Sequence, residues 1–217
     1  MTAYTSSTTC SGIDLPGHGE RADEARQSHA GAPGVIREAA GEIDGVLDAV
    51  HDAFGTVFDR DRTAIGGMSM GGMITLRRLC EPHRFVCAAI EGATGDLMRL
   101  YFPRADDPRG PWPVDHDRGD VESISAAPHL GGFAPVPLLA LHSEADEMVP
   151  WPGQRDFLEE LRERYRDAGA DPALIEQVTW PETGAPFEHV GFGARSSEAK
   201  TIQTEFLRRH LNGEGGA

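Results

Sequence analysis

The sequence predicts an α/β fold in which helices cover both faces of a mostly parallel central sheet. Short apolar runs alternate along the chain with amphipathic segments of helical period, and turn residues bound each run. The runs are apolar throughout, as is typical of parallel strands buried on both faces. A chain of 217 residues is long enough for one such domain, so we expect a single domain over residues 1–217.

The predicted elements follow one another in alternating order. Residues 35–54 carry apolar side chains at helical spacing, and residues 62–67 form a short apolar run that ends in glycines. Helical period returns over residues 70–81. The remaining predicted elements are strands at 85–92, 137–143 and 175–180 and helices at 155–169 and 198–211.

Residues 93–136 interrupt the alternation. This segment contains YFPRADDPRGPWPVDHDRGD, which is rich in proline and aspartate, and we expect a small insertion or lid after the strand near residue 90. Asp115, His116 and Asp117 could hold a metal ion. A solvated acidic loop is the better interpretation of these residues, and no metal site is predicted.

The charge balance limits the partners of the chain. Aspartate and glutamate number 35 against 20 lysines and arginines, so the formal net charge of −15 argues against nucleic acid. Lys200 is the single lysine, and an acidic surface with so little lysine resembles proteins of salt-loving archaea. An ordinary acidic protein from a GC-rich genome is the alternative.

The sequence shows little sign of a membrane segment, a disulfide framework or a cysteine metal site. The longest apolar runs are too short to span a bilayer, and the first residues lack the regions of a signal peptide, so we expect a cytoplasmic protein without a membrane partner. Cys10, Cys80 and Cys87 are odd in number and lack metal-ligand spacing. We interpret them as reduced, partly buried thiols.

Ser69 is the predicted nucleophile. It stands in GGMSMGG, residues 66–72, between a predicted strand and a predicted helix, and residues 67–71 fit the G-x-S-x-G motif. Glycines two residues on either side let the strand and helix approach while the serine takes a strained turn. The backbone N–H of Met70, at the helix start, would face the oxyanion of a tetrahedral intermediate.

A serine nucleophile needs a base, and the base needs an orienting acid. Asp146, in LHSEADEMVPW, follows a buried strand at the carboxyl edge of the sheet, and we prefer it to Glu144 and Glu147. His189, in FEHVGFG, follows the next strand. We prefer it to His210, which lies in the terminal helix.

Four segments in this order, IDLPGHGER, GGMSMGG, LHSEADEMVP and EHVGFG, resemble the α/β-hydrolase superfamily. The resemblance is greatest to its prolyl-oligopeptidase-like and dienelactone-hydrolase-like small esterases, and it spans about residues 13–211. It implies a three-layer α/β-hydrolase fold that needs no cofactor. It also implies Ser69 as nucleophile, His189 as general base and acid, Asp146 as the orienting carboxylate and the Met70 amide as one oxyanion donor.

The chain departs from the family at its beginning. Such hydrolases carry an earlier strand and a His-Gly type loop that gives the second oxyanion donor, whereas here only MTAYTSSTTCSG precedes Ile13. The resemblance therefore implies an N-terminally truncated fold and leaves the second donor open. Loss of one donor costs about a hundredfold or more in rate, so weak catalysis and self-association through a sheet edge are expected. His18, in the PGHG segment, belongs to a loop that is chiefly structural in such hydrolases.

The expected reaction is hydrolysis of a carboxylic ester or related acyl bond in a small molecule, through an acyl-enzyme. Met68, Trp112, Trp151 and Phe187 are candidates for the substrate pocket, although aromatic residues beside prolines as often only anchor loops. Two alternatives stay open. One is a peptidase-like or dienelactone-like acyl hydrolase, and the other is a catalytically weak or silent domain. The acyl and alcohol groups and the oligomeric state are left open as well.

Overall fold

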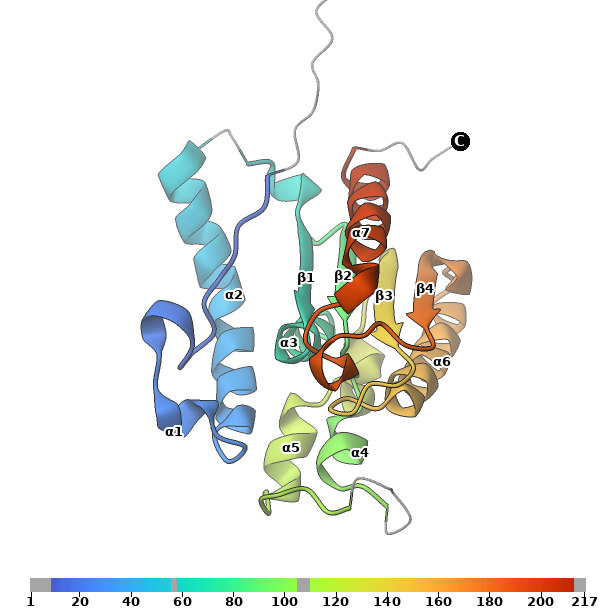
Figure 1. Ribbon diagram of the computed structural model, residues 1–217. Helices are drawn as coiled ribbons and strands as arrows, with labels where there is room; N and C mark the ends of the chain where they lie inside the picture. Colours follow the sequence, from blue (N-terminus) through green and yellow to red (C-terminus); the bar gives the residue numbers. More distant parts are fainter. Residues whose placement is uncertain (1–8, 56–57, 105–109, 213–217) are drawn as a thin grey trace, which may run out of the picture.

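A parallel sheet forms the centre of the computed structural model, which describes residues 9–55, 58–104 and 110–212 (Figure 1). The described strands lie in the order β1-β2-β3-β4, and each neighbouring pair is parallel. The predicted α/β fold is therefore confirmed. The strands are β1 (Ala64–Met68), β2 (Cys87–Glu91), β3 (Leu138–Ser143) and β4 (Ile175–Trp180).

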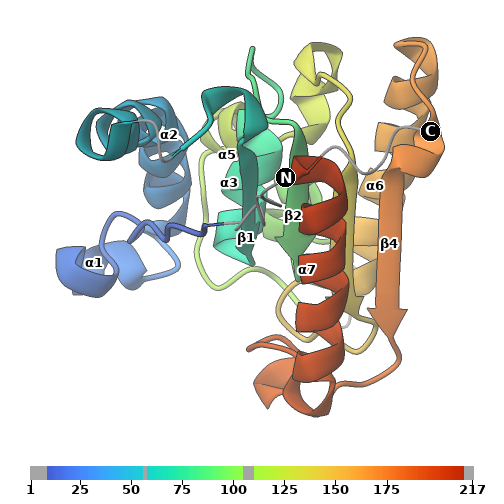
Figure 2. The same cartoon turned by 90° about the horizontal axis from the view of Figure 1, so that it is seen from above.

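Helices cover both faces of the sheet (Figure 2). On one face lie α3 (Met70–Arg78) and α6 (Trp151–Asp167), while α2 (Ala32–Phe54) stands beside α3, beyond the β1 edge of the sheet, and shares their apolar core. The opposite face carries α7 (Ser196–Leu211), which contacts β2 and β3. The three layers are thus helix, sheet and helix.

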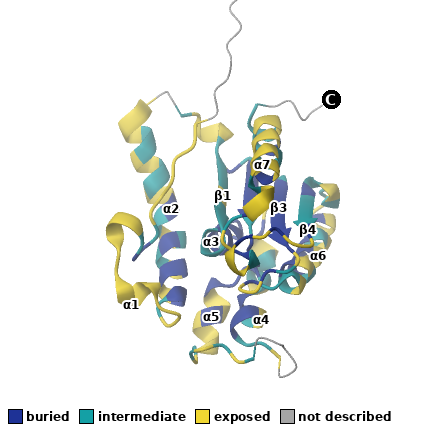
Figure 3. Cartoon of the chain, viewed as in Figure 1, coloured by how far each residue is buried: buried dark blue, intermediate teal, exposed yellow. Residues whose placement is uncertain are grey.

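Alternate residues of the inner strands enter the two cores. In β3, Leu138 and Ala140 face the core shared with α2, α3 and α6, whereas Leu139 and Leu141 face α7 and its Phe206. All residues of β3 are buried, as Figure 3 shows for the centre of the sheet. This burial on both faces explains why the sequence of β3 is apolar almost throughout.

The predicted elements are present, with shifted bounds. The helix expected at 155–169 begins at Trp151, and the helix expected at 35–54 begins at Ala32. Each carries a proline in its first turn, where the missing N–H has no intrahelical acceptor to lose. In both helices the apolar periodicity begins about one turn after the first helical residue. The sequence therefore predicted the start of each helix too late.

Two α-helices of the described residues lie between β2 and β3, in the segment expected to be an insertion or lid. They are α4 (Leu97–Tyr101) and α5 (Arg118–Ile124), and their apolar side chains enter the core that α2 and α3 share. Residues 105–109 of the proline-rich stretch lie outside the described residues. Whether the segment is an insertion stays a prediction.

The remaining short helices of the described residues are η1 (Gly19–Arg21), α1 (Glu24–Gln27), η3 (Arg60–Arg62), η4 (Ala127–Gly132), η5 (Pro172–Leu174), η6 (Pro186–Glu188) and η7 (Gly193–Arg195).

The three cysteines are free thiols in different surroundings. Cys80 and Cys87 are buried, while Cys10 is exposed, so partial burial was the wrong expectation for each. Burial raises the pKa of Cys80 to about 12 and that of Cys87 to about 11.

Among the described helices, none combines the length and the apolar character needed to cross a membrane.

Candidate active site

Ser69 occupies the sharp turn between β1 and α3. Its backbone has φ 52° and ψ −119°, a conformation that a residue with a side chain seldom adopts. The neighbouring strand and helix hold it there, because its N–H donates to Glu91 O at 2.7 Å and its carbonyl accepts from Met73 N at 3.0 Å. The turn thus places the hydroxyl beyond the carboxyl end of β1.

The glycines around Ser69 have unequal roles. A Cβ on Gly67 would lie 2.5 Å from the backbone carbon of Gly71, so the strand and helix approach as closely as the motif predicts. A Cβ on Gly71 itself would meet open space. Gly72 carries the other close approach, since a Cβ there would lie 2.5 Å from that of Ala93. The second required glycine is therefore Gly72, one residue outside the motif.

The structure brings the three predicted catalytic residues together. Ser69 Oγ lies 2.7 Å from His189 Nε2, and His189 Nδ1 lies 2.7 Å from Asp146 Oδ2. An ionised carboxylate only accepts hydrogen bonds, so Nδ1 carries the proton and Nε2 is free to accept the proton of the serine hydroxyl. His189 and Asp146 are both buried.

The Asp146 carboxylate is fixed by its own loop. Its Oδ1 accepts hydrogen bonds from the backbone N–H groups of Met148 at 2.8 Å and Val149 at 2.7 Å, which leaves Oδ2 for the histidine. Glu144, which also follows β3, accepts instead from the hydroxyl of Thr179 at 2.7 Å. The geometry therefore favours Asp146 over its acidic neighbour.

Glu147, His210 and His18 make their contacts outside the triad. Glu147 is exposed, and its N–H donates to Phe187 O. His210 packs its ring on Phe206 within α7. His18 keeps its Nδ1 3.1 Å from Pro16 O in its own loop, which agrees with a structural part for that loop.

Sequence reasoning missed His142, a second histidine beside Asp146. Its ring is fully buried at the end of β3, with Nε2 donating to Val149 O at 2.7 Å and lying 3.4 Å from Asp146 Oδ2. Burial lowers the pKa of His142, so the ring is neutral and presents an N–H to the acid loop. The only sequence signal is its place four residues before Asp146.

Met70, the predicted oxyanion donor, begins α3, so its N–H has no intrahelical acceptor and stands at the positive end of the helix dipole.

The predicted pocket residues do not all lie beside the nucleophile. Met68 ends β1 beside the nucleophile. Trp151 packs against His142, with ring centroids 5.6 Å apart. Trp112 packs on Tyr101 at 4.6 Å, so its observed ring contacts favour an anchor for α4.

Exposed apolar side chains flank the acid and the base. Phe187 is 62% exposed, Val190 57% and Met148 48%, and each lies within two residues of Asp146 or His189 in the sequence. Large apolar side chains left in water beside polar groups are typical of binding surfaces. The three side chains are therefore candidates for contact with an apolar part of a substrate.

The acidic loop that could have held a metal has other contacts. Asp117 caps α5 by accepting from Asp120 N at 2.9 Å, and His116 packs edge-on against Tyr101 at 4.9 Å. Over the ranges that the structure describes, the potential metal ligands nowhere gather in a group of three or more.

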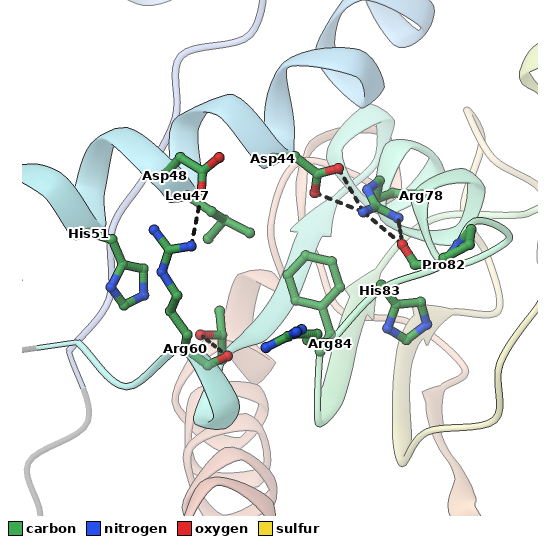
Figure 4. Close-up of a pocket in the computed structure, with 11 residues that line it drawn as sticks. Asp44, Leu47, Asp48, His51, Arg60, Arg78, Pro82, His83 and Arg84 are labelled. Carbon is green, nitrogen blue, oxygen red and sulfur yellow. Dashed lines mark hydrogen bonds and ion pairs between the residues drawn. The ribbon is translucent and has the colours of Figure 1, made fainter.

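A cavity of about 320 Å³ lies near the amino ends of β1 and β2 (Figure 4). It is thus at the end of the sheet opposite to Ser69. All three of its arginines are already paired, since Arg78 donates to Asp44 at 2.7 Å, Arg60 lies 3.0 Å from Asp48 and Arg84 lies 3.6 Å from Asp61. The cavity takes no part in the triad geometry.

The model of one protein family matches most of the chain. Residues 42–213, about four fifths of the chain, match the model of the prolyl oligopeptidase family, Peptidase_S9. The chain belongs to the prolyl oligopeptidase family. The matched range includes all three residues of the Ser69, Asp146 and His189 arrangement. A search of curated proteins gives no match.

Solved structures share the fold of this prolyl oligopeptidase family member. TT1662 from Thermus thermophilus has a TM-score of 0.61 and 23% identity over 90% of this chain and 75% of its own. The acylaminoacyl peptidase of Pyrococcus horikoshii has a TM-score of 0.55 and 19% identity over 78% of this chain and 27% of its own. A puromycin-hydrolyzing peptidase of Mycobacterium tuberculosis has a TM-score of 0.59 and 22% identity, over 82% of this chain and 25% of its own.

These likenesses establish the α/β-hydrolase fold. The chain spans about a quarter of the length of the two peptidases and three quarters of TT1662. The family match and these structures therefore agree on an α/β-hydrolase fold of the prolyl oligopeptidase type.

Proposed function

We propose that the protein is a serine hydrolase that cleaves a carboxylic ester or related acyl bond through an acyl-enzyme. The observation that carries the proposal is the pair of 2.7 Å contacts that join Ser69 to His189 and His189 to Asp146. Membership of the prolyl oligopeptidase family supports the same class of chemistry. A place in the cytoplasm stays a prediction.

The reaction proceeds in two halves. Ser69 Oγ attacks the substrate carbonyl while its proton passes to His189 Nε2, and the resulting imidazolium is stabilised by Asp146. The Met70 N–H donates to the oxyanion of the tetrahedral intermediate. His189 then gives the proton to the departing oxygen, which leaves as an alcohol. A water molecule attacks the acyl-enzyme by the same route and releases the acid.

The exposed apolar side chains favour a substrate with an apolar group next to the scissile bond. Phe187 and Met148 are exposed and lie two residues from the base and the acid in the sequence, and we infer that they contact an acyl or alcohol chain of the substrate. We therefore assign a small ester with a short apolar chain as the first substrate to test.

A peptidase is the second candidate. It is supported by the match to Peptidase_S9 and by the titles of two solved structures of similar fold, an acylaminoacyl peptidase and a puromycin-hydrolyzing peptidase. The same residues could cleave an amide, since His189 can protonate a leaving amine. Parallel assays with p-nitrophenyl esters and N-acyl aminoacyl p-nitroanilides separate the two candidates by their kcat/KM values.

Labelling with a fluorophosphonate probe tests the nucleophile. We expect the purified protein to be labelled and to hydrolyse a short p-nitrophenyl ester, and Ser69→Ala to lose both properties. Ser197→Ala, a change at an exposed serine of α7, is the control and should behave as the unchanged protein. A protein that neither reacts with the probe nor turns over either substrate class would be a silent domain, and the proposal would be wrong.

A further inference from the structure

The backbone before His189 is strained. Phe187 has φ 55° and Glu188 has φ 49°, so two successive residues with side chains lie in the left-handed region. Such residues are disfavoured and persist only where surrounding contacts hold them. Something in this loop must therefore keep the two residues, and with them the catalytic histidine, in place.

The Glu188 carboxylate makes the contacts that hold the loop. Its Oε2 accepts from Thr183 N at 2.6 Å, from Thr183 Oγ1 at 2.8 Å and from Ser143 Oγ at 2.7 Å. Its Oε1 accepts from Gly184 N at 2.7 Å. Four donors thus converge on one side chain.

These bonds involve the ionised form of the carboxylate. They hold the pKa of Glu188 down to about 2, with the Thr183 backbone N–H as the largest cause and the Ser143 hydroxyl next. Burial would raise the pKa of a carboxyl group, so hydrogen bonding is the reason for the lowered value.

The donors come from both sides of the site. Ser143 is the last residue of β3 and stands three residues before Asp146, while Thr183 and Gly184 follow β4. The same two loops meet at a second point, where Glu147 N donates to Phe187 O at 3.1 Å. Glu188 therefore ties the loop of the base to the strand end that carries the acid.

We propose that Glu188 is a positioning residue whose carboxylate fixes the base loop on the end of β3 and so sets the His189 imidazole between Ser69 and Asp146. The expected effect on the reaction rate rests on the proposed function. The position that Glu188 gives to the His189 ring rests on the geometry alone. Glu188 itself need not touch the substrate. Its effect reaches the reaction through the adjacent His189.

Glu188→Gln tests this at constant side-chain size. A glutamine presents an NH₂ where one carboxylate oxygen now accepts, and this group cannot accept from the N–H and O–H donors that face it. The loop should shift by a fraction of an ångström to about one ångström, and misplacement on this scale lowers rates by up to about a hundredfold. We expect kcat on a short ester to fall by about tenfold to a hundredfold, with KM changed by less than about threefold.

Glu182→Gln is the matched control. Glu182 is an exposed carboxylate in the same loop, so its replacement removes the same charge near the site without removing the four hydrogen bonds. We expect its kcat and KM to equal those of the unchanged protein. Equal losses in the two variants would show a general effect of charge and overturn the positioning role.

A spectroscopic readout separates positioning from mere stability. The far-downfield proton resonance of His189 Nδ1–H reports its hydrogen bond to Asp146, and Asp146→Asn assigns it by removing that partner. Glu188→Gln should shift or broaden this resonance, and Glu182→Gln should leave it in place. A lower melting temperature with unchanged kcat and resonance would overturn the proposal.

Ser143→Ala provides a milder variant if Glu188→Gln does not fold. It removes one of the four donors, so the expected loss in kcat is about threefold to tenfold, with a smaller change in the resonance. An unchanged kcat and resonance in Ser143→Ala would likewise count against the proposal. If the unchanged protein fails every hydrolase assay, the proposed function is wrong, while the His189 resonance still decides whether Glu188 positions the ring.

Discussion

Gly92 lies against the imidazole of His189, for a Cβ placed on this glycine would stand 3.4 Å from both Nδ1 and Cε1 of the ring. Gly92 directly follows β2 and has φ 52°, so its backbone also favours a residue without a side chain. The end of β2 is thus in contact with the ring of His189. A methyl group at this position would be in ordinary van der Waals contact with the ring, whereas a larger side chain would have to displace the ring or the strand end.

We expect Gly92→Leu to impair catalysis more than folding. The left-handed backbone costs a residue with a side chain about 1–2 kcal/mol, and atoms beyond Cβ would crowd the ring, which already lies 3.4 Å from the Cβ position, and lower kcat by about tenfold or more. Gly169→Leu is the control, since Gly169 has φ 74° and a Cβ there would meet nothing within 4 Å. Ester hydrolysis and urea unfolding of both variants measure the two effects. Equal kcat values in the two variants would contradict the prediction.

The three glycines around the nucleophile should respond unequally to alanine. Gly67→Ala and Gly72→Ala each push a methyl group into atoms about 2.5 Å away, and overpacking of this kind costs about 1–3 kcal/mol. Gly71→Ala places its methyl group in open space and should be neutral or slightly stabilising, because alanine favours helices. Thermal melts of the three variants check this order. A Gly71→Ala variant as unstable as the other two would refute it.

One thiol per chain should react rapidly in the folded protein. Cys10 is exposed, whereas burial keeps Cys80 and Cys87 protonated at neutral pH and away from reagent. Titration with dithionitrobenzoate at pH 8 should release about one equivalent before denaturant and about three after it. Cys10→Ser should abolish the fast phase. Rapid reaction of more than one thiol in the native protein would show that the inner cysteines are accessible.

The net charge of −15 predicts that salt stabilises the fold. Potassium chloride screens repulsion between carboxylates, and the screening length falls from about 10 Å at 0.1 M to about 3 Å at 1 M salt. We expect the melting temperature to rise over this range and to rise less near pH 4, where many carboxylates are protonated. A melting temperature that stays flat or falls with salt would remove the halophile interpretation.

Acid should abolish the contribution of Glu188 to stability. Its pKa in the folded protein is about 2, below the ordinary value of 4.5, so folding favours the ionised form. The stabilisation is complete above about pH 5 and is lost as the pH falls toward 2. The difference in unfolding free energy between the unchanged protein and Glu188→Gln should therefore be constant from pH 6 to 8 and shrink in acid. A difference that does not depend on pH would mean that the carboxylate bonds contribute nothing.

The sequence was sufficient for the order of the elements and for the meeting of Ser69, Asp146 and His189. Parallel strands buried on both faces carry their own apolar signal, and their carboxyl ends share one edge, so residues placed just after them are brought together. Neither the order of the elements nor the meeting of the three residues depends on knowing in which direction a side chain points. Whether the three residues catalyse a reaction stays a prediction.

Contacts between distant loops could not be predicted. His142 and Glu188 have local patterns that fit a strand end and an exposed loop, and only the fold places them beside Asp146 and Ser143. The need for glycine at position 72 likewise arises from Ala93, which follows the next strand. Such requirements depend on tertiary distances, which periodicity and motif spacing do not encode.

The position of α7 affects how the chain is made. Cys87, Ala89, Leu139 and Leu141 form the face of the sheet that α7 and the loop before it cover, and α7 follows all four described strands in the sequence. A ribosome releases the chain from its N-terminus at about 5–20 residues per second, so the strands emerge before their cover exists. This face is therefore open to chaperones and to other nascent chains until residue 211 has left the exit tunnel, and only then can the domain close.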